Sequence, residues 1–73
     1  MNLFTDNADI LIKASRTDDG YEIASVNRAA PSANNLHSTA VNTYSAVGVA
    51  YRMRNAYMLA GVPDSAIEVG IEP

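Results

Sequence analysis

Three groups of residues in this 73-residue chain have types and spacings that could do chemistry: a single histidine, an acidic turn and a short basic cluster. His37 is the only histidine, and the chain has no cysteine. A general base or metal ligand needs companions such as cysteines, carboxylates or a nucleophile held nearby, and no spacing here supplies them. We therefore interpret His37 as a solvated side chain and expect no catalytic residue, no metal site and no cofactor.

The acidic turn is Asp18-Asp19-Gly20. It has some likeness to the acidic loops that bind calcium, but such a loop needs carboxylates at alternate positions and a closing glutamate, which are missing. Aspartate bonds to its own downstream backbone, and glycine supplies the positive φ that closes a hairpin. A turn is the favoured interpretation.

The basic cluster is the run from Tyr51 to Tyr57, in which Arg52 and Arg54 alternate with other side chains. Arginine beside aromatic rings can bind nucleic acid. The whole chain has a net charge of −3, however, and a phosphate backbone needs clustered Lys and Arg. We expect the two arginines to pair with carboxylates or to contact an acidic partner protein. A nucleic-acid-associated protein stays a minor alternative, and it would use Arg16, Arg28, Arg52 and Arg54.

The sequence contains no motif of a known enzyme mechanism. It has no Ser-His-Asp order, glycine-rich phosphate loop or paired catalytic carboxylates. A chain this short can barely frame a cleft, so we predict that it is not an enzyme. Its beginning lacks the pattern of a signal peptide, and no run approaches the ~20 apolar residues of a membrane span. A cytoplasmic protein without membrane contact is the expectation.

Local patterns predict a β-hairpin over residues 9–28. Ile10, Ile12 and Ala14 alternate along its first strand, and Gly20 closes the turn before the second strand. The continuous apolar run at residues 10–12 indicates either cover on both faces of the first strand or a central position in the sheet.

A helix is predicted over about residues 34–60, followed by a final strand over 66–72. Ser32, Asn34 or Asn35 could cap the start of the helix. Gly61-Val62-Pro63 is a strong signal for its end, because glycine adopts the left-handed C′ conformation and proline prevents continuation.

These elements predict a single α+β domain over residues 1–73, with ββαβ order and the helix packed on one face of the sheet. The helix returns the chain, so the third strand should run parallel to the second. Placed beside the first strand, it gives a three-stranded, mainly antiparallel sheet of order 2-1-3. Order 1-2-3, with one parallel pair, is the alternative.

The predicted helix carries two apolar stripes, although a helix lying on a sheet needs only one. We expect the following stripe to cover the sheet: Leu36, Ala40, Tyr44, Val47, Tyr51 and Met58. The opposite stripe is then an outer face available to a partner: Ala46, Val49, Ala50, Met53 and Tyr57. A domain of this size has a thin core and usually needs disulfides, a metal or a partner, which supports this interpretation.

Two resemblances are limited to architecture. The run from Gly61 to Ile67 resembles helix-to-strand junctions such as those of outer-membrane-protein-A-like domains, and it carries no functional residue. A hairpin followed by a helix and a strand resembles some small phage-encoded inhibitors of host enzymes.

The leading hypothesis is a non-enzymatic protein-interaction module, of the inhibitor or accessory kind that a phage or mobile element encodes. The alternative is a self-assembling structural subunit that forms a homodimer through the outer helix face.

Overall fold

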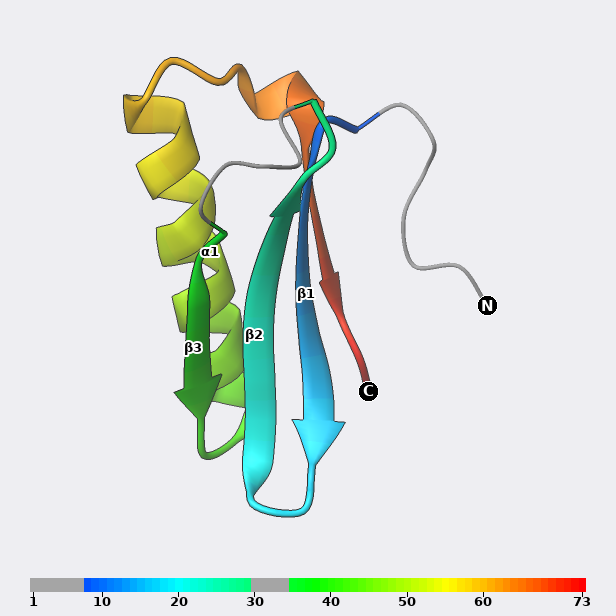
Figure 1. Cartoon of the computed structure of the whole chain (residues 1–73). Helices are drawn as coiled ribbons and strands as arrows, with labels where there is room; N and C mark the ends of the chain where they lie inside the picture. The colour runs from blue at the N-terminus through cyan, green and yellow to red at the C-terminus, as the bar shows by residue number, and fades with distance from the viewer. Residues whose placement is uncertain (1–7, 30–34) are drawn as a thin grey trace.

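The computed structural model describes residues 8–29 and 35–73. Its elements are β1 (Ile10–Thr17), β2 (Gly20–Asn27), β3 (His37–Ala40), α1 (Thr43–Leu59), a 3-10 turn η1 (Asp64–Ala66) and β4 (Ile67–Ile71). The four strands form one mixed sheet in the order β3-β2-β1-β4, and α1 packs on one face of it (Figure 1). The predicted α+β class with a helix on one sheet face is confirmed.

The β1–β2 hairpin follows the predicted pattern. The two strands are antiparallel from Ile10 opposite Asn27 to Thr17 opposite Gly20, with Asp18 and Asp19 as the loop. Gly20 has φ +140°, so the predicted positive φ is confirmed. β1 also lies between β2 and β4, as expected for the most apolar strand.

β3 is a strand that the sequence prediction missed. Residues 37–40 pair antiparallel with β2, whereas the predicted helix includes them. Consequently α1 begins at Thr43, and its N-cap is Asn42, whose side-chain oxygen accepts a hydrogen bond from the Ser45 N–H at 2.8 Å. Asn35 is not a cap, because its side-chain oxygen accepts from the Asn27 N–H instead. The other two proposed caps, at positions 32 and 34, lie outside the described residues.

The additional strand also changes the direction of β4. β4 lies beside β1 as predicted, but it runs parallel to β1, with Ile10 opposite Ile67. β3 reverses the chain once more before the helix returns it, and this extra reversal inverts the last strand. The three-stranded, mainly antiparallel sheet is therefore wrong, and so is the alternative order 1-2-3.

The end of α1 has the predicted glycine stop. Gly61 has φ +102°, its N–H bonds to the Met58 carbonyl, and the Val62 N–H bonds to the Tyr57 carbonyl. These two bonds form a Schellman motif, which satisfies carbonyls that the helix end would otherwise leave open. Val62 packs back against the core. The motif turns the chain toward β4.

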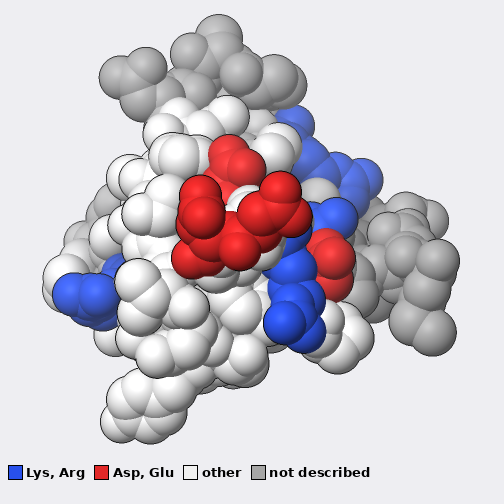
Figure 2. Space-filling view, turned by 90° about the horizontal axis from the view of Figure 1, so that it is seen from below, with Lys and Arg blue, Asp and Glu red and all other residues white. Residues whose placement is uncertain are grey.

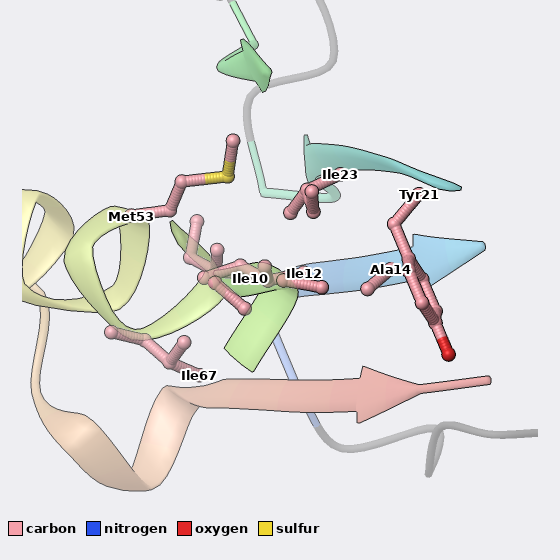
Figure 3. Close-up of a cluster of buried hydrophobic side chains, with 9 residues drawn as sticks. Ile10, Ile12, Ala14, Tyr21, Ile23, Met53 and Ile67 are labelled. Carbon is pink, nitrogen blue, oxygen red and sulfur yellow. The ribbon is translucent and has the colours of Figure 1, made fainter. Parts of the chain in front are cut away.

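The core lies between α1 and the sheet face toward it (Figure 3). The sheet contributes isoleucines from three strands, namely Ile10, Ile12, Ile23 and Ile67. The helix contributes Ala46, Ala50 and Met53, of which both alanines are fully buried. Small helix side chains let the backbone of α1 lie close to the branched isoleucines, which is an efficient packing for a thin core.

A polar bridge links the sheet to both α1 and the start of β3. Ser25 is buried, and its hydroxyl lies 2.7 Å from the Tyr57 hydroxyl. The Leu36 N–H donates to the same serine oxygen at 2.8 Å. One side chain therefore satisfies two groups from different elements.

We predict that Ser25→Ala lowers the free energy of unfolding by about 1–3 kcal/mol, because it leaves the Tyr57 hydroxyl and the Leu36 N–H without their partner at a partly buried place. Tyr57→Phe removes only one of the two bonds, so its loss should be smaller, about 1 kcal/mol. Urea unfolding of both variants measures the difference. Equal stability of Ser25→Ala and the wild type would contradict the role of the bridge.

Candidate protein-binding surface

The residues predicted as a partner interface belong to the core. Ala46, Ala50 and Met53 are buried within the chain, and Val49 and Tyr57 are partly buried against the same cluster. The predicted placement of the two helix faces is therefore wrong. The physical reason is size: the alanines permit close approach to the sheet, whereas Tyr44 and Tyr51 on the other face do not.

The solvent-facing side of α1 carries the large apolar side chains instead. We call these residues the helix stripe: Tyr44, Val47, Tyr51, Met58 and Leu59. Tyr44 is 89% exposed and Leu59 is 90% exposed. The 17 residues of α1 include only two charged ones, Arg52 and Arg54. An exposed helix face is usually charged or polar, so this stripe is unusual for a free surface.

β3 lies at the edge of the sheet, beside α1 (Figure 1). Ser25 donates its N–H to the Leu36 carbonyl, which fixes the direction of backbone groups along this strand. Alternate residues of an antiparallel strand direct both backbone groups to the same neighbour. The N–H and carbonyl groups of His37 and Thr39 therefore face away from β2, toward the outside of the sheet.

A groove runs between this edge and α1. It consists of two neighbouring hollows that share Val49 and Arg52 on the helix. One hollow is bounded by Val41 and Gly48, and the other by Leu36 and Ala56. A Cβ atom built on Gly48 would meet nothing within 4 Å, so the floor of the groove is open there.

The two arginines of the basic cluster have different surroundings. Arg54 lies 3.4 Å from a carboxylate oxygen of Asp64, which follows the helix. Arg52 lies in the groove, and within residues 8–29 and 35–73 the structure gives it no ion pair. Of the two predicted contacts for an acidic partner, Arg52 is thus the one whose charge is available.

The remaining candidates from the sequence form no site of their own. His37 lies in β3 with its Nε2 atom 2.7 Å from a carboxylate oxygen of Glu22, and both side chains are 55% exposed. Seen from the hairpin end, acidic side chains gather near the centre of the surface (Figure 2). The loop residues Asp18 and Asp19 are both exposed. Among the described residues, no group of three or more His, Cys, Asp or Glu could hold a metal ion.

The four arginines of the nucleic-acid alternative are spread over the molecule. Arg16 lies at the loop end of the hairpin, 5.9 Å from the ring centre of Tyr21. Arg28 follows β2 at the opposite end of the hairpin, where its N–H bonds to the Asp9 carbonyl. The structure therefore does not bring these charges into one basic patch.

Sequence reasoning placed most residues of the helix stripe against the sheet, and it missed the β3 edge. The contrast in size between the two helix faces was a usable signal, because Ala46 and Ala50 suit a close contact with a sheet better than two tyrosines do. Residues 37–40, HSTA, carry no comparable signal for a strand.

Within the described parts of the chain, no helix combines the length and the apolar character needed to cross a bilayer. No protein-family model matches the chain, and neither a curated protein nor a solved structure shows significant similarity to it.

Proposed function

We propose that this protein is a non-enzymatic protein-interaction module that binds a larger partner through the exposed face of α1 and the adjoining β3 edge. The observation that carries the proposal is the helix stripe, where large apolar side chains project from a nearly uncharged helix face. Tyrosine and methionine are favoured at protein interfaces, because they bury much area and adapt to a partner's shape.

A homodimer through Ala46, Val49, Ala50, Met53 and Tyr57 is not part of this proposal. Those side chains already pack within one chain, so they offer no free surface.

Tyr51→Glu tests the proposal, because Tyr51 lies in the helix stripe and is 47% exposed. Val26→Glu is a matched control, since Val26 is 48% exposed and lies on β2 away from the stripe. We expect partner proteins captured from a cell lysate by the wild type to be retained by Val26→Glu and lost with Tyr51→Glu. Circular dichroism should show that both variants keep the fold.

Capture of the same proteins by all three forms would contradict a role for the stripe. Sedimentation of the wild type at micromolar concentration adds a second readout. A dimer that Tyr51→Glu dissociates would identify the partner as a second copy of the chain.

A further inference from the structure

Within residues 8–29 and 35–73, no further strand pairs with the outer edge of β3. The groove beside it adds two hollows with apolar linings and the positive charge of Arg52 between them. We propose that it binds an extended segment of a partner protein as a fifth strand, with an acidic side chain of that segment on Arg52. The inference rests on the proposed function in protein binding and specifies the form of the partner.

The strand edge supplies the main-chain contacts. His37 and Thr39 direct their N–H and carbonyl groups away from β2, as the Ser25–Leu36 hydrogen bond requires. An unpaired edge of this kind is a template for another strand, and strand addition uses such groups for affinity. The opposite edge, β4, is less suited, because Glu68 lies within it and Glu72 follows it. Charged side chains protect an edge from pairing.

The groove supplies the specificity. An added strand alternates its side chains, so every second one would point toward α1. The central side chain of this set would meet Arg52, which borders both hollows. The side chains two positions before and after it would each enter one hollow. Val41 and Val49 line one hollow, and Leu36 and Val49 line the other. The complementary segment is therefore apolar–x–acidic–x–apolar, in an extended conformation.

Charge complementarity favours this occupant over a second copy. In a symmetric dimer paired through β3, each chain would bring its own Arg52 toward the shared edge. Two like charges close together oppose association, whereas a carboxylate opposite Arg52 favours it.

The test uses a library of random dodecapeptides displayed on phage and selected on the wild-type protein. We expect the enriched peptides to share the apolar–x–acidic–x–apolar pattern. An enriched peptide, synthesised with a fluorophore, then gives dissociation constants by fluorescence anisotropy for the variants below.

Gly48→Leu should weaken binding at least about tenfold by filling the groove, while the open space at Gly48 leaves the fold intact. Thr39→Pro should do the same, because it removes an N–H that faces away from β2 and an edge strand tolerates such a proline. Arg52→Glu should reverse the charge preference at the central position of the peptide, so that a peptide with lysine there binds more tightly than one with an acidic residue. Lys13→Glu, an exposed change on the sheet face away from α1, should have no effect.

Enrichment of no peptide, or binding that Gly48→Leu leaves unchanged, would overturn the inference. Peptides whose binding is weakened by Tyr51→Glu but not by Gly48→Leu would also overturn the inference. They would leave the proposed function intact. If the wild type forms a dimer that Thr39→Pro dissociates, the β3 edge binds a second copy of the chain, and the inference is overturned. If Thr39→Pro fails to fold, Gly48→Leu and Arg52→Glu decide the question.

Discussion

Gly20→Ala is expected to destabilise the fold by about 3 kcal/mol or more, through a single added methyl group. Gly20 has φ +140°, which a residue with a Cβ atom adopts only under strain. The new Cβ would also overlap the Ala40 carbonyl oxygen and lie 3.0 Å from the Val41 Cα atom. Both are backbone atoms, at the last residue of β3 and the residue after it, so the clash cannot be relieved by the movement of a side chain. Thermal and urea unfolding measure the loss.

Gly48→Ala is the matched control, because it makes the same substitution at a glycine with open space around it. Gly48 lies inside α1, where alanine is the better helix former. We expect this variant to be more stable than the wild type by roughly 0.5–1 kcal/mol. Similar effects of the two substitutions would contradict the close approach of β3 to Gly20.

Met53→Glu should unfold the protein or lower its free energy of unfolding by several kcal/mol. Met53 is 6% exposed and packs among the isoleucines of the sheet. A glutamate there loses this packing and places a carboxylate without a partner in an apolar environment. A small domain has little stability to lose, so circular dichroism should show a largely unfolded chain.

Tyr51→Glu makes a change of similar chemistry two residues away, on the solvent-facing side of α1. It should keep the far-ultraviolet spectrum of the wild type and most of its stability. The comparison decides which face of the helix is core. A folded Met53→Glu together with an unfolded Tyr51→Glu would reverse the arrangement described here and restore the one expected from the sequence.

Local signals in the sequence were sufficient for the hairpin, the helix end and the last strand. Alternation at Ile10, Ile12 and Ala14 and the glycine at position 20 act between near neighbours. The same holds for Gly61, whose conformation depends only on the turn that it closes. These features could be predicted because their physical causes lie within a few residues.

The errors came from β3 and from the helix faces, which depend on distant contacts. HSTA becomes a strand because β2 offers it an edge, and four residues contain too little pattern to show this. Missing one strand also inverted the predicted direction of β4. On the helix, hydrophobicity alone could not rank two apolar stripes. The fit of side-chain size to the space between α1 and the isoleucines decides that Ala46 and Ala50 face inward.

The parallel pairing of β1 with β4 has a consequence for how the chain reaches its fold. β1 becomes a central strand only when Ile67 has taken its place beside Ile10. Contacts between segments so distant in sequence slow folding, because a long loop must close before they form. The hairpin can form early during synthesis, but until β4 arrives the apolar edge of β1 stays open to other chains. We therefore expect pairing of β1 with other chains to be most acute in the interval before β4 docks, and chaperones to act in that interval.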